Sequence, residues 1–148
     1  MHDPACRRRV SSTLQLRVPN RIEELPGVSE AVETLGQEER WAQDVIYAIV
    51  LSLEEVATNV VRHGGSEPGS SEIEIEVTSS DDEVRVEVRD GGRAFDPFHE
   101  APEPDLDAAV EDRKIGGLGV HFVKVLMDET SYSREGGRNH VTMVKRRS

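Results

Sequence analysis

Three short segments of the 148-residue chain carry residues that could act together in chemistry. The first holds Glu55 and Asn59, whose spacing places a carboxylate and an amide on one face of a helix. The second begins with Asp90, which ends a strand-like run and precedes two glycines. The third is the glycine-rich run 116–119, which opens an apolar stretch. Each segment alone is more typical of a wet helix face or a turn, so the prediction of a site depends on their combination.

Glu55 and Asn59 offer oxygen atoms suited to a phosphate site. The amide oxygen of Asn59 is a hard ligand of the kind that Mg²⁺ accepts while it keeps several waters. A carboxylate one turn earlier could polarise a hydroxyl or a water, and such a positioned base typically contributes about 10² to 10⁴ in rate. The alternative for this pair is a polar helix face in contact with solvent.

Asp90 and the glycines after it suggest recognition of a nucleobase. A buried carboxylate at a strand end can accept a hydrogen bond from the exocyclic amine of adenine, whereas guanine presents a carbonyl oxygen. Gly92 would let a flat ligand approach the backbone. The alternative is a turn in which Asp90 only caps the chain. Phe95 could pack beneath a base or into the core, and the sequence leaves both open.

The third segment would present backbone N–H groups to phosphate at the start of a helix. It comprises Gly116, Gly117, Leu118 and Gly119. The more common phosphate motifs are missing: the chain has no GxxxxGK[ST] run, and Phe122 stands where GxGxxG requires its third glycine. A simple turn before a helix is the alternative.

Hydrophobic periodicity predicts the elements that must position these segments. A period of two predicts strands, and a period of 3.6 predicts helices. The expected strands are 13–18, 73–77, 84–88, 130–134 and 140–145, and the expected helices are 21–35, 41–63 and 119–128. Residues 97–115 form a long acidic connection that is typical of a lid. Since the strands have one apolar face, that face needs helices to cover it. We therefore expect an α+β fold, a two-layer sandwich with helices on one face of a mixed, mostly antiparallel sheet.

Composition limits the classes of protein. A formal net charge of -11 disfavours nonspecific binding to nucleic acid or to an anionic membrane. No apolar run approaches the roughly 20 residues of a membrane span, and the start lacks a signal peptide, so we expect a cytoplasmic protein. Cys6 is the only cysteine, which excludes an internal disulfide. The length predicts one domain, residues 12–147, after a loose segment 1–11.

The ordered motifs resemble the ATPase domain shared by gyrase, Hsp90, histidine kinases and MutL, the GHKL superfamily with the Bergerat ATP-binding fold. The resemblance rests on Glu55xxxAsn59, on Asp90 with its following glycines, and on the glycine-rich run with the helix that continues to Asp128. Within this superfamily the chain looks most like the bacterial anti-sigma factor serine kinases of the RsbW and SpoIIAB type. The resemblance extends over nearly the whole chain after its first residues.

This resemblance implies a role for each motif. It implies Glu55 as the catalytic base and Asn59 as the magnesium ligand. It places Asp90 and Gly92 at adenine and the run from Gly116 to Gly119 around the phosphates, with Leu118 inside that run. It also suggests that Thr142, in the last strand, supports the aspartate at the adenine.

The same resemblance implies ATP and Mg²⁺ as cofactors and a small STAS-domain antagonist as the phosphate acceptor. A sigma factor is the implied alternative partner, and a homodimer is the implied assembly. We therefore predict an ATP-dependent protein serine/threonine kinase in a partner-switching pathway. One alternative is a nucleotide-gated interaction module without productive phosphotransfer. The other is a structural domain that binds no nucleotide.

Overall fold

The computed structural model describes residues 10–63, 71–100 and 117–147. Five strands, four α-helices and one short 3-10 helix are described in these ranges. They are β1 (Val10–Pro19), η2 (Ile22–Glu24), α1 (Leu25–Glu38), α2 (Gln43–His63), β2 (Glu72–Ser80), β3 (Glu83–Asp90), α3 (Pro97–Glu100), α4 (Gly117–Leu126), β4 (Glu129–Glu135) and β5 (Arg138–Arg146).

Most expected elements are present, and the differences lie at their ends. β1 begins at Val10, inside the segment that we expected to be loose. The expected lid contains the short helix α3, and the remainder of that expected lid, 101–115, lies outside the described residues. Element ends depend on individual hydrogen bonds, so they are less well determined by periodicity than element type.

The five strands form one sheet in the order β1-β2-β3-β5-β4. The α+β class is confirmed. We expected a mixed, mostly antiparallel sheet, whereas every described strand pairing is antiparallel. Tight turns join β2 to β3 and β4 to β5, and a two-residue turn can only reverse the chain. Gly136 and Gly137, with φ of 58° and 75°, supply the left-handed backbone that the second turn requires.

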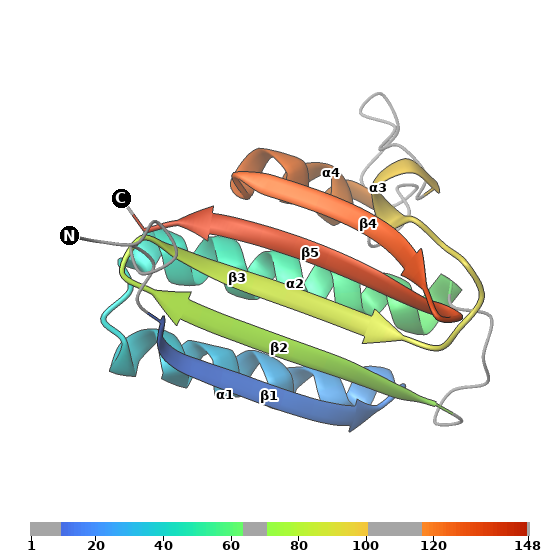
Figure 1. The fold of residues 1–148 in the computed structure, drawn as a ribbon, viewed down its shortest axis with the longest axis horizontal. Helices are drawn as coiled ribbons and strands as arrows, with labels where there is room; N and C mark the ends of the chain where they lie inside the picture. Colours follow the sequence, from blue (N-terminus) through green and yellow to red (C-terminus); the bar gives the residue numbers. More distant parts are fainter. Residues whose placement is uncertain (1–9, 64–70, 101–116, 148) are drawn as a thin grey trace.

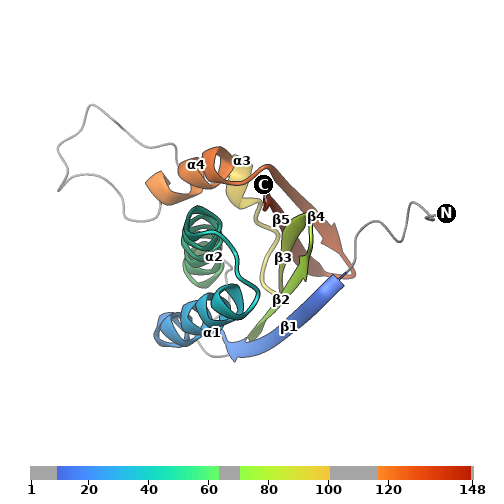
Figure 2. The same ribbon diagram turned by 90° about the vertical axis from the view of Figure 1, so that its left-hand side faces the viewer.

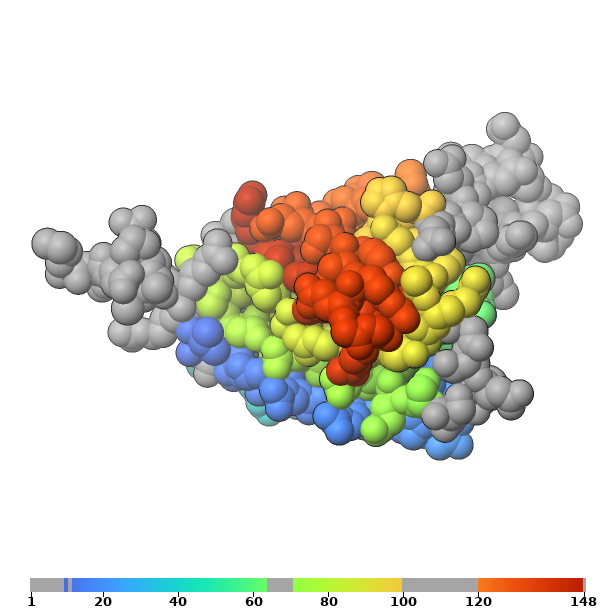
Figure 3. Space-filling model, turned by 45° about the vertical axis from the view of Figure 1, so that its right-hand side comes forward, coloured from blue at the N-terminus to red at the C-terminus, as the bar shows by residue number. Residues whose placement is uncertain are grey.

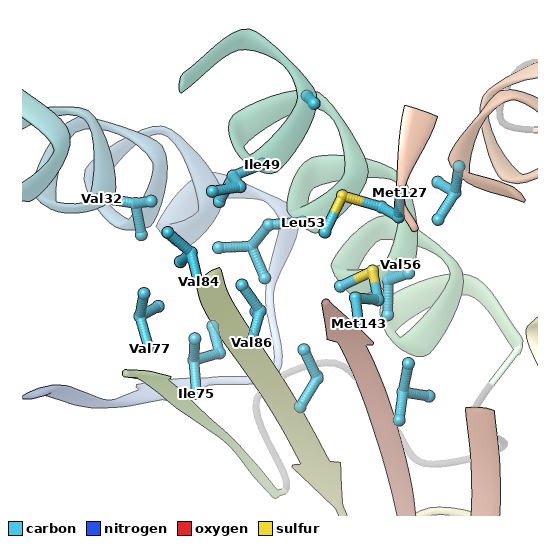
Figure 4. Packing of buried hydrophobic residues seen from close by; sticks show 14 of the residues in the cluster. Val32, Ile49, Leu53, Val56, Ile75, Val77, Val84, Val86, Met127 and Met143 are labelled. Carbon is cyan, nitrogen blue, oxygen red and sulfur yellow. The ribbon is translucent and has the colours of Figure 1, made fainter. Parts of the chain in front are cut away.

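The helices cover one face of the sheet (Figures 1 and 2). α2 lies in the middle of the helix layer, between α1 and α4 (Figure 2). Apolar side chains from α1, α2, α4 and the dry face of the sheet meet between the two layers, as Figure 4 shows. The fully buried side chains there include Val32, Ile49, Leu53, Val56, Ile75, Val77, Val84, Val86 and Met143.

The corner between α1 and α2 is fixed to the sheet by Trp41. Its side chain is buried, and its indole Nε1 donates a hydrogen bond of 3.0 Å to Oγ of Ser79 at the end of β2. A buried indole N–H needs a partner, so this bond sets where the corner lies. Among the described residues, no helix combines the length and the apolar composition of a membrane span.

Gly36, near the end of α1, occupies a place where a side chain does not fit. A Cβ atom built there would lie 2.6 Å from Cε3 of Trp41 and 2.9 Å from Cγ1 of Ile46. We expect Gly36→Ala to lower the free energy of unfolding by about 1–3 kcal/mol, because an overpacked core must shift or strain. Urea denaturation measures this change.

Gly27 is the matched control in the same helix. No atom outside its local chain lies within 4 Å of a Cβ built at Gly27. Gly27→Ala should therefore leave stability unchanged or raise it by up to about 1 kcal/mol, since alanine loses less backbone entropy on folding. Equal effects of the two substitutions would contradict the close packing at Gly36.

Candidate functional site

A small cavity lies where the last turns of α2 meet the end of β3 and the start of β5. Its lining combines two residues predicted from sequence, Asn59 and Asp90, although they stand on different elements. The complete lining is Val56, Asn59, Val60, Asp90, Phe95, Pro97, Asn139 and Val141. The free volume is about 10 Å³, which is room for about one water molecule. A planar base therefore needs the lining to open.

Asp90 is the last residue of β3, and only 3% of its surface is exposed. One carboxylate oxygen, Oδ1, accepts hydrogen bonds from the backbone N–H of Gly92 at 2.9 Å and from Nδ2 of Asn139 at 3.1 Å. The turn cap and the buried carboxylate that we treated as alternatives therefore coexist. Both donors meet Oδ1, so Oδ2 is the oxygen with which Asp90 can accept a bond from a ligand.

Asn139 is the residue that sequence reasoning missed. It is 3% exposed, and it stands directly opposite Asp90 in the β3–β5 pairing. Besides Asp90, its Nδ2 donates to the carbonyl oxygen of Arg93 at 2.8 Å. Its Oδ1 accepts from the backbone N–H of Phe95 at 3.2 Å and from the hydroxyl of Tyr132 at 2.5 Å. The bonds to Asp90, Arg93 and Phe95 require this amide orientation, because a rotated amide would direct its oxygen at the carboxylate and the carbonyl and its NH₂ group at the backbone N–H.

Thr142 does not reach the site. It lies three residues after Asn139 in β5 and is paired with Glu87 and Ser131, so it belongs to the outer face of the sheet. Asp90 belongs to the inner face. Because successive side chains alternate between faces, an odd separation along a strand reverses the side. The support that we expected from Thr142 comes from Asn139.

Glu55 and Asn59 lie one turn apart on α2, as their spacing predicts. Nδ2 of Asn59 donates to the carbonyl oxygen of Glu55 at 2.7 Å, which leaves its Oδ1 available as a ligand atom. Oε2 of Glu55 is buried and has no hydrogen-bond partner among residues 10–63, 71–100 and 117–147. Burial raises the pKa of Glu55, the charge of Glu54 raises it further, and the charge of Arg62 opposes both. A carboxylate in this environment accepts a proton more readily than an exposed one.

Phe95 lines the cavity. Its ring stacks on the ring of His63, with centroids 4.9 Å apart and planes at 19°. Arg93 holds both residues, since its Nε donates to the carbonyl oxygen of His63 at 2.9 Å and its guanidinium carbon lies 5.9 Å from the centre of the Phe95 ring. Phe95 is thus a wall of the cavity, and its displacement would open the space for a base.

The β4–β5 hairpin supports the segment that follows β3 from the other side. Nη1 of Arg134 donates to the carbonyl oxygen of Gly92 at 2.7 Å. In Figure 3 the surface of this hairpin, in orange-red, lies directly beside the yellow surface of residues 91–100. The backbone at Gly92 is therefore held both by Asp90 and by the hairpin.

The glycine-rich run is described only in part. α4 begins at Gly117, so Gly117, Leu118 and Gly119 form its first turn. Gly116 lies outside the described residues. Buried Val120 and Val123 belong to the core, and α4 packs beside α2 (Figure 2). The first turn of a helix such as α4 presents backbone N–H groups of the kind that bind phosphate.

The described part of the chain contains no cluster of three or more histidine, cysteine or acidic residues that could hold a metal ion. A binding site formed by Asn59 with phosphate oxygens and water molecules fits the chemistry of Mg²⁺, which retains water and uses few protein ligands.

Comparison with known proteins identifies relatives that cover most of the chain. Residues 18–145 match the family described as the histidine kinase-like ATPase domain. The chain is 28% identical over 113 residues to the serine/threonine-protein kinase BtrW of Bordetella bronchiseptica, which covers 76% of this chain and 79% of that protein. It is 29% identical over 128 residues to the serine-protein kinase RsbW of Halalkalibacterium halodurans, with coverage of 84% and 78%.

The fold also resembles a solved structure, that of the RsbU and RsbW domains of Rv1364c from Mycobacterium tuberculosis. The TM-score is 0.67 at 18% sequence identity. The similarity covers 92% of this chain but only 32% of that longer chain. At this identity the likeness concerns the fold.

Replacement of Asn139 by alanine tests the hydrogen-bond network. Asn139→Ala would leave Asp90 with one hydrogen-bond donor fewer. It would also leave the carbonyl oxygen of Arg93 and the backbone N–H of Phe95 without the side-chain partner that Asn139 provides. We expect the free energy of unfolding to fall by about 2–3 kcal/mol, since buried polar groups without partners are costly. The control is Thr142→Ala in the same strand, which should change stability by no more than about 0.5 kcal/mol. Urea denaturation measures both changes. A larger loss of stability in Thr142→Ala than in Asn139→Ala would indicate that Thr142, and not Asn139, supports Asp90.

The raised pKa of Glu55 predicts how stability depends on pH. The folded state holds the proton of Glu55 to a higher pH than the unfolded state, so ionisation of this group costs stability as pH rises. We expect Glu55→Gln to be more stable than the parent protein at neutral pH, with a difference that disappears below the ordinary pKa of a glutamate. Thermal unfolding across this pH range measures the difference. A constant difference at all pH values would contradict the prediction.

Proposed function

Because the chain belongs to the histidine kinase-like ATPase domain family, we propose that it is an ATP-dependent protein serine/threonine kinase of the anti-sigma-factor type. The relatives described above are named serine/threonine-protein or serine-protein kinases, which supports kinase activity at the level of the family. The observation that carries the proposal for this chain is the environment of Glu55. One of its carboxylate oxygens, Oε2, is buried without a hydrogen-bond partner among the described residues, and a domain that only bound nucleotide would not need such a group at this position.

Glu55 is proposed as the general base. It accepts the proton of a serine or threonine hydroxyl while the oxygen of that hydroxyl forms a bond to the terminal phosphorus of ATP. The bond between that phosphorus and the bridging oxygen breaks, and ADP leaves. The raised pKa of Glu55 suits this role, because a base is most effective when its pKa lies near the working pH.

The other residues are proposed to bind and orient the nucleotide. Asp90 accepts the hydrogen bond of the adenine amine, and Asn139 and Gly92 keep its carboxylate in place. Asn59 provides one oxygen ligand to Mg²⁺, which neutralises phosphate charge when bound. The first turn of α4, together with Gly116, directs N–H groups at the phosphates. Thr142 is not included, because it lies on the other face of the sheet.

The acceptor is proposed to be a STAS-domain antagonist in a partner-switching pathway, with a sigma factor as the alternative partner and a homodimer as the working assembly. The support for this comes from the family resemblance and from the names of the relatives, among which RsbW recurs. The acidic chain, with its formal charge of -11, fits protein partners better than nucleic acid.

The test combines Glu55→Gln with a phosphotransfer assay. The protein is incubated with radiolabelled ATP, Mg²⁺ and a cognate STAS-domain antagonist, and label on the antagonist is measured with time. Glu55→Gln should lower the rate by about 10² to 10⁴, because it loses the base. Binding of ATP, measured by calorimetry, should remain near that of the parent protein.

Two further variants complete the experiment. Glu54→Gln is the matched control, since Glu54 is the neighbouring carboxylate and accepts a hydrogen bond of 2.8 Å from Ser29. It should keep most of the transfer rate. Asp90→Asn should weaken ATP binding itself. Unchanged transfer in Glu55→Gln would refute the kinase mechanism, and ATP-dependent partner binding without transfer would favour the gated interaction module.

A further inference from the structure

A shallow groove of about 260 Å³ runs between α1 and α2. Its lining is partly apolar with two carboxylates: Glu33, Gln43, Ile46, Tyr47, Val50, Leu51 and Glu54. The sheet covers the inner side of these helices (Figure 2), and the lining residue Tyr47 is largely exposed, so the groove faces away from the sheet. Tyr47 is 63% exposed in this groove, although tyrosine is a large and mostly apolar side chain.

The groove residues form a second ridge on α2. Tyr47, Val50, Leu51 and Glu54 have the spacing i, i+3, i+4 and i+7, so they lie on one face of the helix. The core stripe of α2, which includes Ile49 and Leu53, faces the sheet (Figure 4). A helix at the surface needs only one apolar stripe to hold it on its domain. The second ridge is therefore more than the fold requires.

The groove lies in an acidic part of the chain. Residues 22–61 contain nine aspartates and glutamates and a single base, Arg40. This part therefore contributes -8 to the formal net charge of -11. Glu33 and Glu54 bring two of these carboxylates into the groove itself. A partner must bring positive charge in order to remain close to this surface.

We infer that this groove is a docking surface for a basic amphipathic helix of a partner protein. The space between two parallel ridges of side chains accepts the ridge of a third helix. The apolar side chains of such a helix would contact Tyr47, Val50 and Leu51, and its lysines or arginines would lie near Glu33 and Glu54. Tyrosine is one of the residues that most often dominate the binding energy of an interface.

Charge argues against the other occupants. A second copy of this chain would present the same acidic groove, so two such faces would repel each other. A nucleic acid or an anionic membrane would be repelled for the same reason. The occupant that fits both the apolar ridge and the acidic surroundings is a basic helix.

The groove is separate from the cavity at Asp90. At 3.6 residues per turn, Tyr47 and Asn59 point about 120° apart around α2. A helix docked in the groove would leave the cavity accessible, so the inference goes beyond the proposed kinase activity and does not depend on it. The test reads binding alone, and a failed phosphotransfer assay would leave it intact.

The probe is a synthetic helical peptide of leucine and lysine with its leucines along one face. It carries a fluorescent label, and its binding to the full chain is measured by fluorescence anisotropy at physiological salt. We expect Tyr47→Ala to raise Kd about tenfold, the effect of losing an anchor residue. Glu33→Lys should also raise Kd and should weaken its dependence on salt.

Matched controls separate docking from general attraction to an acidic protein. Phe122→Ala removes another exposed aromatic side chain, on α4, and Glu129→Lys makes the same change of charge on β4. Both should leave Kd within about twofold of the parent value, as for residues outside an interface. A peptide of the same composition with its leucines scattered should bind at least about tenfold more weakly. Circular dichroism checks that each variant is folded.

Three results would overturn the inference. The first is equal binding of the amphipathic and scattered peptides, which would indicate attraction by charge alone. The second is an equal loss of affinity in Glu129→Lys and Glu33→Lys. The third is a change of sedimentation behaviour in Tyr47→Ala without any loss of peptide binding, which would make the groove a contact between copies of this chain.

Discussion

The hydrogen bond between Asn139 and Asp90 joins the end of β3 to the start of β5, and the geometry of the candidate site depends on it. It is possible only because β5 lies between β3 and β4 in the sheet, which sets these two residues opposite each other. The same amide holds the backbone at Arg93 and Phe95. One buried side chain thus fixes both the carboxylate and the path of the chain that leaves it.

α2 is the second element on which the arrangement depends, because it contributes residues to the core, to the cavity and to the groove. One stripe packs on the sheet, its C-terminal turns line the cavity, and its outer ridge borders the groove with α1. Most surface helices need only the first of these. Oε2 of Glu55 is buried without a partner in the described part of the chain, and the ring of Tyr47 is exposed. Both features weaken the fold or its solubility rather than support it, and such sites are where function is expected.

The cavity connects local packing to binding. Phe95 lines the cavity and also stacks on His63 at the end of α2, where Arg93 donates a hydrogen bond to the carbonyl oxygen of His63. A ligand that displaced Phe95 would break this stack and so act on both α2 and the segment after β3. Binding at Asp90 would therefore be coupled to movement at the C-terminal end of α2, because the two share the same aromatic contact.

The sequence by itself determined the type of most elements, the buried side of β2 and β3, and the placement of Glu55 and Asn59 one turn apart on a helix. These follow from periodicity, which the chain carries locally. The tertiary structure alone decided which strand stands beside β3, and hence that Asn139 and not Thr142 supports Asp90. It also decided that Phe95 lines the cavity and that α1 and α2 leave a groove on their outer side. These features arise from register and packing between distant segments, and a one-residue change of register moves every side chain to the other face.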